Sequence, residues 1–191
     1  MEGSSRYSIG IDLGTTNSVV AYVDTADESA AGIRVFEVAQ AVAPGEVRAI
    51  PALPSFLYFP TAAEIASGAF DLPWEDKPFA IAGKAARELG ALVLGRQVAS
   101  AKSWLCQDVL DRIDDILPRE AVPPEPMISP VEASARYLIH LRNAWNHTMA
   151  GEGSDSDLRF ENQEIVVTVP DRKSTRLNSS HEIPSRMPSS A

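Results

Sequence analysis

The segment from Ile9 to Val20 constrains the fold of this chain more than any other part of its sequence. Apolar residues alternate with small or polar ones over Tyr7–Leu13, and a second, valine-rich stretch covers Asn17–Val23. Such alternation predicts two β-strands with one buried face each. The linker Gly14-Thr15-Thr16 predicts a tight hairpin turn between them, because glycine permits backbone angles that other residues avoid.

The same turn predicts a site for a phosphate group. Consecutive backbone N–H groups in a tight turn form a concave nest that binds anions, and threonine hydroxyls add further donors. The nest residues are Gly14, Thr15, Thr16 and Asn17. Asp12, at the end of the first strand, can hold a hydrated Mg²⁺ that bridges to the phosphates. The alternative is a plain hairpin with a polar turn; no Gly-Lys-Ser/Thr follows, so this is not a P-loop.

The rest of the chain mixes strands and helices, which predicts an α/β fold. Further strands are predicted at Ile33–Val38, Ser55–Phe59 and Glu164–Val169, and helices at Lys84–Leu94, at Ala99–Leu117 and from Ser129 to about Met149–Gly151. The last helix has the best signals: Ser129 and Glu132 have the spacing of a capping box, and Pro130 occupies the first helical position. The stretch from Ala43 to Phe79 is otherwise expected to be irregular, because prolines interrupt it.

Composition narrows the function classes. The chain has 191 residues and a formal net charge of −9, which argues against nucleic-acid binding. The N-terminus lacks the features of a signal peptide and no apolar run could cross a membrane, so we expect a cytoplasmic protein. Cys106 is the single cysteine, expected to pack within a helix. His140 and His147 are seven residues apart, with no third ligand at metal-binding spacing, and are expected to be packing or surface residues.

The segment Ile9–Val20 resembles the first phosphate loop of the actin-like ATPase superfamily, in the form found in DnaK-type heat-shock protein 70 chaperones. Five later segments also resemble that family, in the same order: Ile50–Phe59, Ala82–Arg87, Ala101–Leu105, Ser129–Trp145 and Ile165–Pro170. The resemblance implies the first lobe of an actin-like ATPase (ribonuclease H-like) fold, incomplete in this chain. It also implies ATP or ADP with Mg²⁺ as cofactors.

The resemblance assigns roles to individual residues of the turn. Gly14, Thr15, Thr16 and Asn17 contact the β- and γ-phosphates, with the Thr15 hydroxyl near the γ-phosphate, and Asp12 organises Mg²⁺ through water.

One position departs from the family. Arg87 aligns with the family's catalytic lysine, and Lys84 lies three residues too early. Arginine keeps the charge of lysine but not its compact geometry, so the departure puts the rate of hydrolysis in question.

The function implied is that of an ATP-dependent chaperone. The intact protein is expected to hydrolyse ATP and to act on unfolded client polypeptides with co-chaperones, whereas this chain alone is expected to be inactive. Two alternatives share the fold class: a sugar or glycerol kinase, which has a similar loop, and a noncatalytic actin-like scaffold. The kinases usually continue the loop differently, where this chain has Asn17-Ser18-Val19-Val20.

Two regions are distinguished along the chain. Residues 1–170 are predicted to be the N-terminal part of a nucleotide-binding domain. Residues 171–191 are rich in Ser, Arg and Pro and match one reading frame of a common sequencing adapter at both ends. We therefore expect this tail to be disordered and foreign to the natural protein.

Sequencing the source locus checks this interpretation of the tail. The genomic DNA is expected to diverge from the given sequence after the codon for Pro170. Genomic DNA that encodes Asp171–Ala191 in frame contradicts it.

Overall fold

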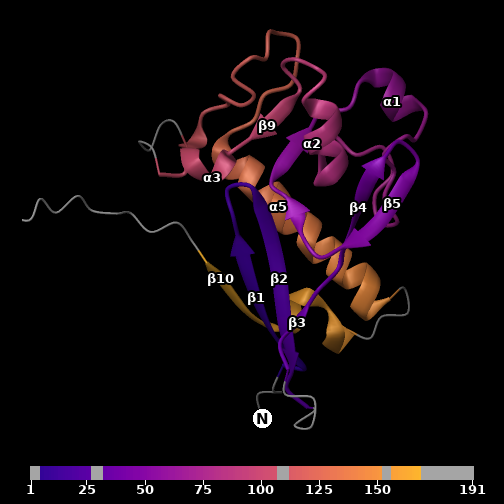
Figure 1. Ribbon diagram of the computed structural model, residues 1–191, viewed down its shortest axis with the longest axis vertical. Helices are drawn as coiled ribbons and strands as arrows, with labels where there is room; N and C mark the ends of the chain where they lie inside the picture. Colours follow the sequence, from indigo (N-terminus) through magenta and orange to yellow (C-terminus); the bar gives the residue numbers. More distant parts are fainter. Residues whose placement is uncertain (1–4, 27–31, 107–111, 152–155, 169–191) are drawn as a thin grey trace, which may run out of the picture.

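The computed structural model describes residues 5–26, 32–106, 112–151 and 156–168, and shows a mixed α/β fold with three sheets (Figure 1). The strands are β1 Tyr7–Leu13, β2 Asn17–Asp24, β3 Arg34–Val35, β4 Val38–Ala43, β5 Glu46–Ile50, β6 Leu53–Pro54, β7 Phe56–Tyr58, β8 Ile81–Ala82, β9 Gln97–Ala99 and β10 Glu164–Thr168. The α-helices are α1 Ala62–Ala66, α2 Lys84–Gly90, α3 Ala101–Trp104 and α5 Pro130–Trp145. A π-helical turn, η2 Asn146–Ala150, extends α5, and two 3₁₀ turns, η3 Ser156–Leu158 and η4 Phe160–Asn162, precede β10.

The first sheet confirms the predicted hairpin. Its order is β10-β1-β2-β3, and β6 also pairs with the start of β2. The three strands β1, β2 and β3 are adjacent and antiparallel, and the strand predicted at Ile33–Val38 is present as β3 with only two residues. β10 pairs with the other edge of β1 in parallel, with Asp12 opposite Thr168. The predicted strand at residues 164–169 is thus confirmed over its described residues, 164–168.

Two smaller sheets lie beside α2, in the upper right of Figure 1. β4 and β5 form an antiparallel hairpin, and β7 lies between β8 and β9. The β4–β5 hairpin corrects the expectation of an irregular stretch after residue 43: Gly45, with φ +72°, makes the turn that lets β5 return along β4.

Helix α5 runs diagonally across the middle of the molecule and carries the core of the first sheet (Figure 1). The side chain of Ser129 accepts a hydrogen bond from the N–H of Glu132, which confirms the predicted start. The reciprocal half of the capping box is missing, because the Glu132 carboxylate pairs with Arg136 instead. The helical region ends at Gly151, φ +64°, within the predicted range.

Trp145 at the end of α5 is fully buried in an aromatic cluster. Its ring centroid lies 5.2–5.4 Å from those of Tyr7, Tyr22 and Phe36 and 6.2 Å from that of Phe160. Its indole N–H donates to the carbonyl of Leu158 at 3.0 Å, so the buried polar group is satisfied. This cluster fixes the sheet on the helix.

The predicted long helix at residues 99–117 is wrong as a continuous element. Ser100 has a left-handed backbone (φ +56°), and α3 covers only Ala101–Trp104 before a turn. Leu117 forms an isolated bridge with Ile128. Cys106 is exposed, so the expectation that it packs within a helix is also wrong. The other predicted helix, Lys84–Leu94, ends early, at Gly90.

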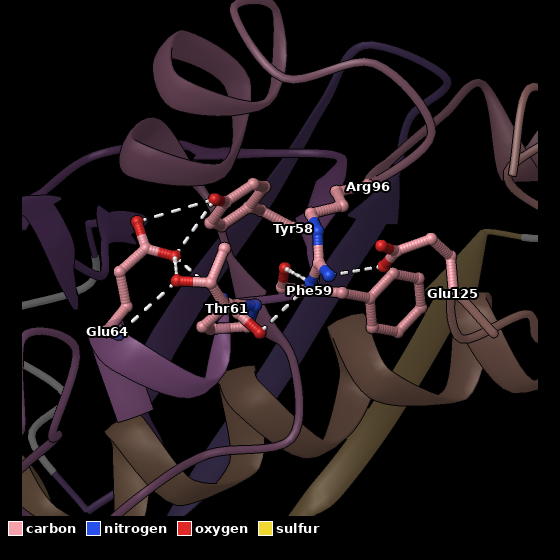
Figure 2. A network of polar contacts seen from close by, with 7 residues as sticks. Tyr58, Phe59, Thr61, Glu64, Arg96 and Glu125 are labelled. Carbon is pink, nitrogen blue, oxygen red and sulfur yellow. Dashed lines mark hydrogen bonds and ion pairs between the residues drawn. The ribbon is translucent and has the colours of Figure 1, made fainter. Parts of the chain in front are cut away.

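A polar network holds α1 and the proline-rich segment after residue 117 to the end of β7 (Figure 2). The Tyr58 hydroxyl donates to the Glu64 carboxylate at 3.0 Å, and Thr61 caps α1 through the same residue. Burial, with Glu64 close by, raises the pKa of Tyr58 to about 12. Arg96 donates to the carbonyl of Phe59 at 3.1 Å and pairs with Glu125. Tyr58, Thr61 and Arg96 each find a partner within this network, so it has a structural role.

Among the described residues, no helix is long and apolar enough to cross a membrane. The predicted tail, residues 171–191, lies outside the described ranges.

His140 joins α5 to β4 and gives stability a testable pH dependence. It is buried, its Nε2 bonds to the Ala39 carbonyl at 3.0 Å, and its ring packs against Trp74. Burial lowers the pKa of His140 from 6.5 to about 4, against the opposing effect of the Ala39 hydrogen bond. Between these values the unfolded chain takes up a proton that the folded chain excludes. The contribution of neutral His140 to the free energy of unfolding is therefore fully present above pH 6.5. It decreases as the pH drops towards 4.

We expect urea unfolding to show a loss of about 1 kcal/mol between pH 7.5 and pH 5.5 from this group alone. His140→Gln should lose this contribution. His147→Gln is the matched control, because His147 also packs on Trp74 but is exposed. An unchanged pH dependence in His140→Gln contradicts the assignment.

Candidate functional site

The predicted phosphate-binding turn lies at the exposed tip of the β1–β2 hairpin. Asp12, Thr15, Thr16 and Asn17 are exposed, whereas Leu13 and Ser18 on either side are buried. The alternation of the two strands produces this pattern, since Ile9, Ile11 and Leu13 point into the core and leave the turn outside.

Gly14 is required by the shape of the turn. A Cβ atom added to Gly14 would lie 2.1 Å from the carbonyl oxygen of Asn17, far inside van der Waals contact. The close approach of these two residues folds the chain back into β2. Glycine therefore serves here to let one backbone segment pass against another.

The donors of the turn are fewer than the sequence predicts. The N–H of Gly14 donates to the Asp12 carbonyl at 3.1 Å, so it is not free for a ligand. Within the four described ranges, the N–H groups of Thr15 and Thr16 donate to no protein acceptor. Both residues are exposed, and they are adjacent in the turn. The turn can thus offer two backbone donors and two hydroxyls to an anion.

Asp12 lies beside a residue that the sequence reasoning missed. Because β1 and β10 are parallel and paired in register, their carboxyl ends meet at one edge of the sheet. The hydroxyl of Thr168 donates to Asp12 Oδ1 at 2.9 Å, which fixes one oxygen of the carboxylate and leaves the other exposed. The available signal was that Thr168 is a polar residue at the end of an apolar strand. The sequence did not indicate that Thr168 lies next to Asp12.

These groups fit a hydrated Mg²⁺. Among the residues that the structure describes, no three His, Cys, Asp or Glu side chains gather closely enough to enclose a metal ion. Mg²⁺ keeps several waters and is commonly bound through one or two carboxylates plus substrate phosphates, so the single carboxylate of Asp12 suits it.

Arg87 is not brought to the turn. It lies on α2, half exposed, and its ionic partner is Glu88, at 3.7 Å. No hydrogen bond or ion pair joins it to residues 12–17 in the described part of the chain. The two regions are linked indirectly: Ser55 contacts the turn, and the next residue, Phe56, accepts the N–H of Gly83 just before α2.

A buried serine supports the turn from below. Ser55, only 2% exposed, donates from its hydroxyl to the Gly14 carbonyl at 2.8 Å and from its N–H to the Thr16 carbonyl at 2.9 Å. The sequence predicts a strand here but gives no sign that it touches the turn, because the contact spans 41 residues.

A cavity of about 510 Å³ lies elsewhere, between the C-terminal end of α2, β9 and residues 117–120. Trp104 lines it, with the Arg119 guanidinium 5.1 Å from the ring centroid. It shares no lining residue with the turn, so the phosphate site predicted from the sequence and this cavity are separate features.

Comparisons with known proteins do not identify the chain. A scan against models of protein families gives no match, and a search of curated proteins also gives none.

The role of Gly14 leads to a stability prediction. Gly14→Ala is expected to lower the free energy of unfolding by more than about 2 kcal/mol and to change the amide signals of residues 14–17. Gly10→Ala is the control, because a Cβ there meets only the Ala21 carbonyl oxygen, at 4.0 Å. It should change stability by less than about 1 kcal/mol. Equal effects in urea unfolding contradict the steric account.

Proposed function

We propose that the turn Asp12–Asn17 binds the phosphates of ATP or ADP together with Mg²⁺. The observation that carries this proposal is an exposed turn, shaped by Gly14, in which two N–H groups have no acceptor among the described residues and an oriented carboxylate lies nearby in the sequence. Donors and a cation-holding carboxylate at one point are what a Mg²⁺–phosphate group requires.

We further propose that the chain belongs to the ATP-binding domain of a heat-shock protein 70-type chaperone with an actin-like ATPase fold. Three features support this: the sequence resemblance, the three adjacent antiparallel strands, and the phosphate-type turn at their first connection. Unfolded client polypeptides and co-chaperones would be partners of the whole protein, and the cytoplasm its compartment.

Among the described residues, one face of the first sheet is left exposed, which supports membership in a larger domain. Val35, Ala21, Gly10 and Val166 form one row across β3, β2, β1 and β10 on the side opposite α5. Val35 is 52% exposed and Val166 is 59% exposed. A row of apolar groups on one sheet face is typical of a surface that another element covers.

In this proposal each residue of the turn has a physical task. The N–H groups and hydroxyls of Thr15 and Thr16 donate to phosphate oxygens, and Thr168 holds the Asp12 carboxylate towards the bound cation. When bound, Mg²⁺ supplies charge neutralisation to the phosphates. In the described part of the chain Arg87 forms its ion pair with Glu88, and no hydrogen bond or ion pair joins it to the turn. Phosphoryl transfer needs stabilisation from several sides, and this chain alone should therefore bind weakly and turn over nothing.

The rival function is phosphorylation of a sugar or of glycerol. It uses the same kind of turn, so the binding site does not separate the two functions. What favours the chaperone type is the sequence around the turn and the Pro54-Ser55 segment that packs beneath it. A third possibility, an actin-like scaffold, predicts nucleotide binding without a client.

The test is titration of the 191-residue chain with MgATP, followed by amide NMR and by phosphate release. We expect weak binding that shifts the amides of residues 15–17 and no phosphate release above background. Mg²⁺ should raise the affinity of the unmodified chain for ATP. In Asp12→Asn this increase should be about tenfold smaller, which corresponds to about 1.4 kcal/mol. Asp115→Asn, at another exposed carboxylate, should behave like the unmodified chain.

Two results contradict the proposal. One is a set of shifted amides that lies away from the turn, and the other is equal behaviour of the two variants. Steady turnover with transfer of phosphate to a sugar favours the rival.

A further inference from the structure

Ser55 uses every polar group that it has at the junction of three elements. Its hydroxyl and N–H go to the carbonyls of Gly14 and Thr16 in the turn, as described above. Its carbonyl accepts the Tyr137 hydroxyl of α5 at 2.9 Å, and its Oγ lies 3.0 Å from the Oγ of Ser18 in β2.

The direction of these hydrogen bonds follows from a count of protons. Ser55 has one hydroxyl proton, and it goes to the Gly14 carbonyl, which can only accept. The Ser18 hydroxyl is therefore the donor in its contact with Ser55. Burial raises the pKa of Tyr137, so its hydroxyl stays protonated and donates to the Ser55 carbonyl. Ser55 is held on two sides and can itself hold the turn.

Peptide geometry turns these contacts into an orientation of the site. In a planar trans peptide, the C=O of one residue and the N–H of the next point in opposite directions. Ser55 draws the carbonyls of Gly14 and Thr16 towards the interior. The N–H group of Thr15, which follows the Gly14 carbonyl, must then point away from Ser55, towards the exposed side of the turn.

We propose that Ser55 is the positioning residue of the phosphate turn: by binding the Gly14 and Thr16 carbonyls it fixes the turn and aims the N–H group of Thr15 at the anion. Tyr137 extends this support to α5. The inference rests on the proposed function, because it assigns how the same site is organised. Ser55 contacts neither the phosphate nor the cation in this account.

The test compares two buried serines of the same hydrogen-bonded pair. Ser55→Ala removes the hydroxyl bond to Gly14 but keeps the N–H bond to Thr16, so it should release mainly the Thr15 amide. Ser18→Ala removes the bond between the serines and leaves both contacts on the turn. Ser55→Thr keeps the hydroxyl and should restore the site. Amide spectra and circular dichroism check that each variant is folded.

We expect the affinity for MgATP, measured by amide NMR titration of the 191-residue chain, to fall about tenfold in Ser55→Ala. It should stay within about twofold of the unmodified chain in Ser18→Ala and Ser55→Thr. A folded Ser55→Ala that binds as well as the unmodified chain overturns the proposal, and so does an equal loss in Ser18→Ala.

The ligand-free spectra separate this proposal from the proposed function. In Ser55→Ala the Thr15 amide should shift and its order parameter should fall, while Ser18→Ala should leave both unchanged. If the unmodified chain shows no response to MgATP, the proposed function fails. A Thr15 amide that Ser55→Ala leaves unchanged overturns the positioning role in either case.

Discussion

The hydrogen bonds of Ser55 are the interaction on which the candidate site depends. They join the turn of the first hairpin, the segment between β6 and β7, and the helix α5 at one buried residue. A buried polar side chain is costly unless it is satisfied, and here all its groups are satisfied. The same bonds that remove this cost fix two carbonyls of the turn. Stability of the junction and orientation of the site therefore have one cause.

Packing of α5 holds that junction in place. Trp145 sits at one end of the helix against aromatic rings of β1 and β2, and Tyr137 lies two turns earlier on the way to Ser55. The hairpin is thus supported along its length, by ring contacts near its open end and by hydrogen bonds at its tip. Asp12 gains its orientation from a third direction, through the parallel pairing of β1 with β10.

Sequence patterns correctly predicted the elements that depend on interactions between residues close together in the chain. Alternation and one glycine gave the β1–β2 hairpin, and Ser129 with Pro130 gave the start of α5. The prediction of a helix at residues 99–117 was wrong because Ser100 has a left-handed backbone and Leu117 pairs with Ile128. Helical propensity indicates neither feature. The β4–β5 hairpin had a signal in Pro44-Gly45, which the many prolines nearby obscured.

The contacts that complete the site were beyond a reading of the sequence alone. Asp12 and Thr168 are separated by 156 positions, and Gly14 and Ser55 by 41. Their proximity depends on strand register, which is set by the whole core. The residues named from the turn itself lie together, whereas Arg87, assigned through the resemblance alone, lies on α2 with no hydrogen bond or ion pair to them in the described ranges.

A crystal structure of the chain grown with MgADP tests the central claim, phosphate binding at the turn, most directly. The account predicts phosphate oxygens about 3 Å from the backbone nitrogen of Thr15, with the cation on the side of Asp12. A nucleotide bound in the cavity beside Trp104, or phosphates that leave residues 12–17 untouched, would contradict it.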